Sequence, residues 1–173
     1  MKRIVLLVLF VTTTFCANAQ LKFGDMLACT RDEVNVRTGP GTNYPVGEVD
    51  RNSKANPLND SDISKIIKKY NIYTEGLELY KLKKATDKEE YCQLNKPLTN
   101  YNSEDYISYY YLGKSQNGNL YIGVFFAGFF GDRYVYKGWV PSQYLKKGCG
   151  NCKGGGFVLD EGKICPKCHG RGY

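Results

Sequence analysis

The C-terminal part of the chain contains the same pattern twice, and this repeat constrains the fold more than any other feature. Residues 149–156 and 165–172 both read Cys-x-x-Cys-x-Gly-x-Gly. A Cys-x-x-Cys turn brings its second thiolate back beside the first, and the glycines permit positive φ angles that turn backbone N–H groups toward sulfur. Two such turns supply four thiolates, the tetrahedral ligand set of structural zinc. The sequence therefore predicts a zinc site in residues 149–173, with the ligands Cys149, Cys152, Cys165 and Cys168.

Two other uses of these cysteines remain open at the level of sequence. An oxidising compartment would favour disulfides. Residues 165–169 also read Cys-Pro-Lys-Cys-His, which matches a covalent haem attachment site. The first copy has Lys153 where the second has His169, however, and haem does not account for the repeated glycines. We therefore expect zinc, with His169 as a bystander.

The N-terminus has the parts of a signal peptide. Lys2 and Arg3 are followed by an uninterrupted apolar run over residues 4–11, and Ala17 and Ala19 are small residues at the two positions that a signal peptidase reads. We expect residues 1–19 to be removed by cleavage after Ala19. The sequence thus predicts an exported protein, either periplasmic or secreted.

Neither a membrane anchor nor lipidation is expected. The apolar run over 4–11 is far shorter than the roughly 20 residues that span a bilayer. A lipid on Cys16 would require a small residue before it, and the chain has Phe15 there. Cleavage leaves 154 residues (173 − 19), enough for one domain and a small appendage. No second long apolar run exists, so we expect no membrane span in the mature chain.

The charge of the chain is mildly basic. Cleavage removes Lys2 and Arg3 and lowers the formal net charge from +7 to +5. The remaining basic residues are scattered, and nothing resembles the basic stripe of a nucleic-acid-binding protein. The charge is compatible with an acidic cell-wall polymer but does not require one. We expect no nucleic-acid partner.

The body of the chain reads as mainly β with one helix. The pair Asn117-Gly118, which is preferred in tight hairpins, separates two aromatic-rich runs over 106–112 and 120–126. A last long strand is expected over 134–140. The helix is predicted over 62–70, with Asp60 or Ser61 as its N-cap. Its apolar residues fall on a single face, at the spacing i, i+3, i+4 and i+7: Ile63, Ile66, Ile67 and Tyr70.

Two separated segments resemble the signatures of bacterial Src homology 3 domains. Residues 34–41 (Val-Asn-Val-Arg-Thr-Gly-Pro-Gly) resemble the opening signature, and residues 138–145 (Gly-Trp-Val-Pro-Ser-Gln-Tyr-Leu) resemble the closing one. The resemblance implies a small barrel over residues 24–146, with a partly helical insertion at about 51–104. It also implies a module that binds a cell-wall peptide or glycan, or an envelope protein. The ligand is not identified by the fold.

The tail resembles half of the cysteine-rich zinc domain of DnaJ-type chaperones, which has four copies of the repeat and two zinc ions. Two copies imply one zinc ion here. The His-Pro-Asp tripeptide of the J domain is absent, so the resemblance does not imply a heat-shock partner chaperone. The expected fold is thus mainly β: a small Src-homology-3-like barrel with a partly helical insertion, followed by a small zinc knuckle hairpin.

Five residues of the body carry further expectations. Trp139, together with Val140 and Leu145, is expected to plug the end of the barrel rather than to contact a ligand. Cys29 and Cys92 form either a disulfide or two buried free thiols, and the sequence leaves both alternatives open.

The sequence argues against an enzyme. Catalysis by a cysteine or serine needs a nearby base, and the sole histidine, His169, lies inside the second Cys-x-x-Cys repeat. The carboxylate pairs Glu89-Glu90 and Asp160-Glu161 lie on charged stretches and are expected to be solvated. The first hypothesis is an exported, non-catalytic binding module with a structural zinc tail. The alternatives are a thiol-disulfide or redox-sensitive metal switch and a chaperone-like holder of unfolded clients.

Overall fold

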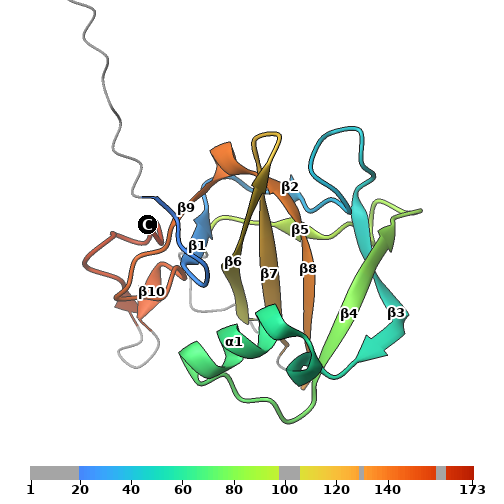
Figure 1. Ribbon diagram of the computed structural model, residues 1–173. Helices are drawn as coiled ribbons and strands as arrows, with labels where there is room; N and C mark the ends of the chain where they lie inside the picture. Colours follow the sequence, from blue (N-terminus) through green and yellow to red (C-terminus); the bar gives the residue numbers. More distant parts are fainter. Residues whose placement is uncertain (1–19, 98–105, 129–130, 159–162) are drawn as a thin grey trace, which may run out of the picture.

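The computed structural model describes residues 20–97, 106–128, 131–158 and 163–173, and it is mainly β (Figure 1). The predicted signal peptide over 1–19 and the pair Asp160-Glu161 lie outside the described residues. A seven-stranded sheet has the order β3-β4-β8-β7-β6-β1-β9. Its strands are β1 (Met26–Cys29), β3 (Gly47–Ala55), β4 (Leu77–Lys84), β6 (Tyr106–Gln116), β7 (Asn119–Ala127), β8 (Arg133–Pro141) and β9 (Leu145–Lys147).

Shorter elements complete the fold. Strand β2 (Val34–Asn35) pairs with β5 (Gln93–Leu94), and β10 (Phe157–Val158) pairs with β11 (Lys163–Ile164). The helical elements are η1 (Pro57–Asn59), α1 (Ser61–Tyr70) and η2 (Ser142–Tyr144). Within the described part of the chain, no helix has the length and apolar character needed to cross a bilayer.

The centre of the sheet is the hairpin of β6 and β7, which continues antiparallel into β8. Asn117 and Gly118 form its turn with φ angles of 49° and 70°, the left-handed conformation that a tight hairpin requires. The prediction of a hairpin at this pair is therefore confirmed.

The segment interpreted as an insertion contributes to the main sheet. Residues 51–97 supply most of β3, all of α1 and the whole of β4. Strand β4 pairs parallel with β8, with Leu79 opposite Val135. A parallel pair needs a crossover connection rather than a tight turn, and here the partners lie far apart in the chain.

Two clusters of buried side chains hold the sheet from its two faces. On the outer face, α1 packs its apolar side against the central strands, as its spacing predicts. On the inner face, β2 and β5 close over the sheet. The fully buried members are Ile63 and Ile66 on α1, Val135 beneath it, and Leu27, Cys29, Val36, Leu94, Ile122, Val124 and Val140 on the inner face.

The expectation that Trp139 plugs the barrel is wrong. Val140 is fully buried in the inner cluster, which also includes Leu145, but Trp139 is half-buried on the opposite face of β8. Successive side chains of a strand point to opposite faces of the sheet. Trp139 and Val140 therefore cannot both enter the same core.

Asp60 links the start of α1 to the sheet. Its carboxylate accepts hydrogen bonds from the backbone N–H groups of Asp62 and Ile63, both at 3.1 Å, and forms an ion pair with Lys137 on β8. Burial alone would raise the pKa of Asp60, but Lys137 and the two backbone donors lower it below its ordinary 3.8. At the other end, Asn71 closes the helix with a left-handed φ of 50°.

We expect Asp60→Ala to lower the free energy of unfolding at pH 7 by about 1–2 kcal/mol, because it removes both the helix cap and the ion pair. Asp60→Asn keeps the cap acceptor and should cost less than about 1 kcal/mol. A lowered folded-state pKa means that the contribution of the charge is complete above the ordinary pKa and is lost as the pH falls through the lowered value. Urea unfolding at pH 7 and pH 3 checks this: the deficit of the Asn variant should shrink in acid. Equal losses for both variants at pH 7 would contradict the capping role.

Candidate metal centre

The four cysteines of the repeats come together as one cluster. The Sγ atoms of Cys149, Cys152, Cys165 and Cys168 all lie within 4.8 Å of one another, and this group could hold a metal ion. The Sγ atoms of Cys149 and Cys165 are 4.0 Å apart, and those of Cys152 and Cys168 are 3.6 Å apart. A tetrahedron with metal–sulfur bonds of about 2.3 Å has sulfur–sulfur separations of about 3.8 Å. A disulfide would need about 2.05 Å. The geometry therefore fits four thiolates around one ion.

The two repeats build the same local structure twice and interlock. Equivalent residues are 16 apart in the chain. The N–H of Cys149 donates to the Gly172 carbonyl at 2.6 Å, and the N–H of Cys165 donates to the Gly156 carbonyl at 2.9 Å. In each repeat, the carbonyl of the last glycine thus accepts a hydrogen bond from the first cysteine of the other repeat. Strands β10 and β11 join the two as a hairpin.

The glycines of the motif are required by this interlock. Gly156 and Gly172 have φ angles of 75° and 78°, a region that L side chains rarely adopt. A Cβ on Gly156 would lie 2.3 Å from the carbonyl oxygen of Gly170, and one on Gly172 would lie 2.3 Å from that of Gly154. Both contacts involve backbone and cannot be relieved by turning a side chain.

Hydrogen-bond donors surround the sulfur atoms. The N–H groups of Gly156 and Gly172 donate to the Sγ atoms of Cys152 and Cys168 at 3.2 Å and 3.3 Å. These are the donors that the glycine pattern predicted. The side-chain amide of Asn151 donates to Cys165 Sγ at 3.3 Å. Sequence reasoning missed Asn151, because the second repeat has Lys167 in its place and the motif leaves this position free.

The protonation of the cluster is uneven. Burial alone would raise the pKa of Cys165, but donation from Asn151 and from backbone groups lowers it to about 6. Burial and the neighbouring Cys168 thiol raise the pKa of Cys152 to about 12. Several thiolates this close together repel one another and are stabilised by a bound cation. Metal binding to the cluster is therefore expected to release protons from its thiols.

The tail is fixed to the body of the protein. The N–H of Gly148 donates to the Met26 carbonyl at 2.7 Å, and Lys147 forms an ion pair with Asp25 at 3.1 Å. A Cβ on Gly154 would lie 2.9 Å from the Leu27 carbonyl oxygen. The tail therefore packs against β1, beside β9, as Figure 1 shows.

His169 does not join the ligand cluster. It is exposed and has a φ of 52°, while the equivalent Lys153 has a φ of 50°. The two residues occupy the same turn position in their repeats. The repeat therefore accommodates either side chain, as expected for a bystander.

Cys29 and Cys92 are both buried free thiols in the inner cluster. Cys29 Sγ donates to the Arg31 carbonyl at 3.0 Å. Burial raises the pKa of Cys92 to about 11, which keeps this thiol protonated and poorly reactive. Of the two alternatives left open by the sequence, the structure shows the free thiols.

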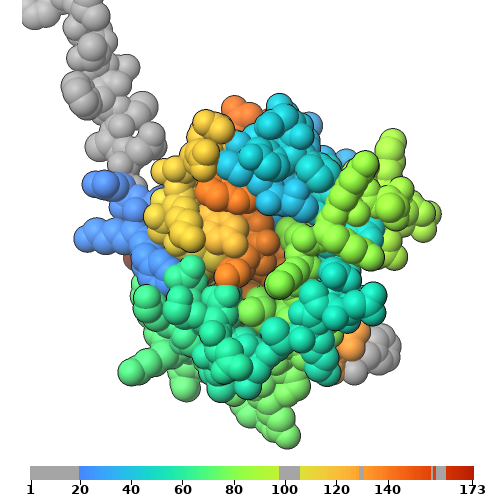
Figure 2. Space-filling model, turned by 45° about the vertical axis from the view of Figure 1, so that its right-hand side comes forward, coloured from blue at the N-terminus to red at the C-terminus, as the bar shows by residue number. Residues whose placement is uncertain are grey.

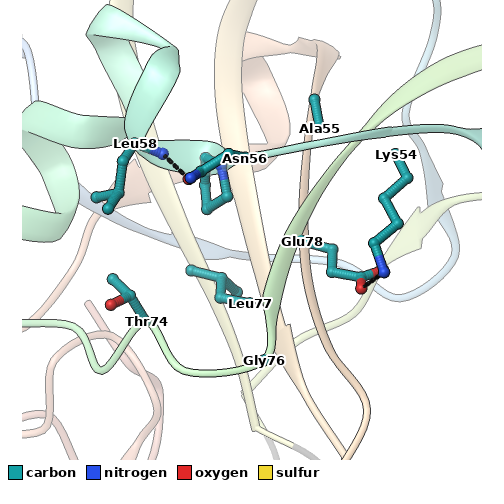
Figure 3. A pocket seen from close by; sticks show the side chains of 9 residues that line it. Lys54, Ala55, Asn56, Leu58, Thr74, Gly76, Leu77 and Glu78 are labelled. Carbon is teal, nitrogen blue, oxygen red and sulfur yellow. Dashed lines mark hydrogen bonds and ion pairs between the residues drawn. The ribbon is translucent and has the colours of Figure 1, made fainter.

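A hollow of about 610 Å³ lies between the end of β3, η1 and the start of β4 (Figure 3). Three of its polar side chains already have partners: Lys54 pairs with Glu78, and the Asn56 side chain accepts from the N–H of Leu58. Figure 3 shows both interactions at the rim of the hollow. With these groups engaged, the hollow offers less ligand chemistry than the cysteine cluster.

No protein-family model, curated protein or solved structure matches the chain.

Proposed function

We propose that this chain is an exported, non-catalytic binding module whose tail holds one structural zinc ion at Cys149, Cys152, Cys165 and Cys168. The observation that carries the proposal is the closed cluster of four mutually close sulfur atoms. Catalytic zinc keeps one coordination position open for water or substrate, whereas structural zinc has four protein ligands. An all-sulfur tetrahedral set is typical of zinc or iron–sulfur clusters, and four thiolates in two knuckles suit a single zinc ion.

The contact between the two signature segments supports the barrel resemblance. Arg37, in the opening signature, exchanges both backbone hydrogen bonds with Trp139 in the closing one, at 2.9 Å and 3.0 Å. Segments that are far apart in the chain thus lie side by side. The resemblance implies a binding role, for a cell-wall glycan or peptide or for an envelope protein.

The proposed site of action is outside the cytoplasm, periplasmic or secreted, on the basis of the leader over residues 1–19. Export and zinc place opposing demands on the four thiols. An oxidising compartment favours disulfides, so zinc must be captured early or held tightly. The interlocked backbone, which positions all four sulfur atoms together, favours tight retention.

Metal content and free-thiol count test the zinc part of the proposal. The mature protein, purified from its own compartment, should contain one zinc ion per chain. Its four tail thiols should resist alkylation until a chelator is added. A metal-free protein with two tail disulfides would contradict the proposal and support a redox switch instead.

Retention on envelope material tests the binding part. The purified mature protein should be retained on isolated cell wall or should capture an envelope protein. The control variant is Tyr73→Ala, which changes an aromatic residue outside the signature segments. It should be retained as strongly as the wild type. Absence of retention on both cell wall and envelope extracts would contradict the binding role. Suppression of client aggregation that requires the four tail cysteines would support a chaperone-like holder.

A further inference from the structure

Two aromatic rings and a lysine form a row across the outer face of the sheet, beside the backbone of Arg37. Tyr121 on β7 and Trp139 on β8 are register partners, with ring centroids 4.9 Å apart and planes inclined by 37°. Arg37 is the backbone partner of Trp139 on its other side. Lys114 Nζ lies 5.4 Å from the centroid of the Tyr121 ring. We call Arg37, Trp139, Tyr121 and Lys114 the aromatic row: two adjacent rings with the Lys114 ammonium at one end and the Arg37 backbone at the other.

The aromatic row lies just beyond the part of the sheet that α1 covers. The row of Gly123 and Lys137 is under the start of the helix. A Cβ on Gly123 would lie 3.3 Å from Ile63 Cδ1, and Lys137 pairs with Asp60, the residue that caps the helix. The next row of the sheet is the aromatic row, where both rings remain half-buried and Lys114 is exposed.

Figure 2 shows this part of the surface. Strand β8, in orange, is visible at the floor of a recess. The gold β6–β7 hairpin, the blue segment that follows β2, and green α1 surround it. The Arg37 guanidinium donates to the Tyr44 carbonyl at 2.6 Å, which anchors this segment beside the row.

We propose that the aromatic row binds a glycan whose sugar rings carry carboxylates. The proposal rests on the proposed binding function and assigns a ligand class and a surface to it. The C–H faces of a sugar ring are apolar and can cover an aromatic face without leaving polar groups unpaired. The Lys114 ammonium lies beside the Tyr121 ring and can attract a carboxylate on a neighbouring sugar, whereas the Arg37 guanidinium donates to the Thr42 and Tyr44 carbonyls.

The backbone around the row argues for a glycan rather than a peptide. Extended peptides commonly add a strand to an exposed sheet edge, where they find unpaired N–H and C=O groups. Strand β7 is paired with β6 and β8 on its two sides, and β8 is paired with Arg37 beside Trp139. The row thus offers aromatic rings and the Lys114 cation but no free sheet edge.

The single tryptophan of the chain provides a direct test, because Trp139 alone supplies the indole fluorescence. The full mature protein is titrated with peptide-free peptidoglycan glycan strands, in which every second sugar carries a lactyl carboxylate. A saturable change in Trp139 fluorescence is expected. The neutral N-acetylglucosamine hexamer should bind at least about 10-fold more weakly than the acidic glycan strands, because it cannot make the charge-assisted contacts.

Three variants locate the contact. Lys114→Glu, at an exposed position, should weaken binding of the glycan strands by about 10-fold or more at low salt. Tyr121→Ala should weaken the binding of both the acidic and the neutral glycan, because both use the ring face. Tyr73→Ala removes an aromatic side chain that is 63% exposed elsewhere on the surface and should bind like the wild type.

The outcomes separate this inference from the proposed function. Retention on cell wall with no fluorescence change, and with no effect of Lys114→Glu, would place the contact elsewhere and overturn the inference alone. A fluorescence change with released stem peptides, but not with glycan strands, would show a peptide ligand and overturn the glycan assignment. Absence of retention on any envelope material would overturn both.

Discussion

Replacing Cys165 by Ser is expected to abolish metal retention and to unfold residues 149–173. Among the described side chains of the tail, Cys152, Cys165 and Cys168 are buried and Cys149 and Val158 are partly buried, so this described part has no apolar core beyond the cysteines. Small units of this kind depend on the metal for folding, and the apparent binding free energy of structural zinc is about 10–16 kcal/mol. Elemental analysis should fall from one metal ion per chain to nearly none.

Unfolding of the tail should also destabilise the neighbouring strands of the main sheet. Gly148 donates to the Met26 carbonyl, and β9 pairs with β1, so an unfolded tail removes partners from one edge of the sheet. We therefore expect faster amide hydrogen exchange in β1 and β9 than in the wild type, with β7 unchanged. The control is Cys92→Ala, which removes a buried thiol of the inner cluster and should lower stability while keeping one metal ion. Full metal retention by Cys165→Ser would contradict the four-ligand site.

Local patterns predicted the local structure well. Helix α1 begins at Ser61, one residue before the predicted start, because the Asp60 carboxylate can reach the backbone N–H groups of the first turn. The Asn117-Gly118 hairpin and the four-cysteine cluster were likewise readable, since each depends on residues close together in the chain. In such cases, side-chain chemistry and backbone geometry are decided within a few positions.

The sequence did not predict the features that depend on distant segments. Nothing in the residues of β4 indicates that it pairs parallel with β8, because β5, β6 and β7 separate the two strands in the chain. The closing signature reads as one apolar group, but the alternation of side chains along β8 puts Trp139 on the face opposite Val140. The docking of the tail through backbone carbonyls of Met26 and Leu27 leaves no signature in their side chains.

Gly138→Val is expected to lower the free energy of unfolding more than any single surface change, by at least about 3 kcal/mol. Gly138 lies on β8 where the segment after β2 crosses close to it. A Cβ there would lie 2.3 Å from Val36 Cγ1, 2.9 Å from Leu82 Cδ1 and 3.2 Å from the Arg37 carbonyl oxygen. Val36 is fully buried and has little room to move. The crossing of the two signature segments therefore requires a residue without a side chain at this position.

A graded set of variants tests this crossing by urea unfolding. Gly138→Ala should cost about 1–3 kcal/mol, because its single methyl group already meets Val36. Combining it with Val36→Ala should restore part of that loss, since the smaller partner makes room and the two changes are coupled. Gly150→Ala is the matched control: a Cβ there meets nothing within 4 Å, and the expected change is within about 0.5 kcal/mol. Strictly additive losses in the double variant would mean that the two segments do not touch at Gly138 in solution.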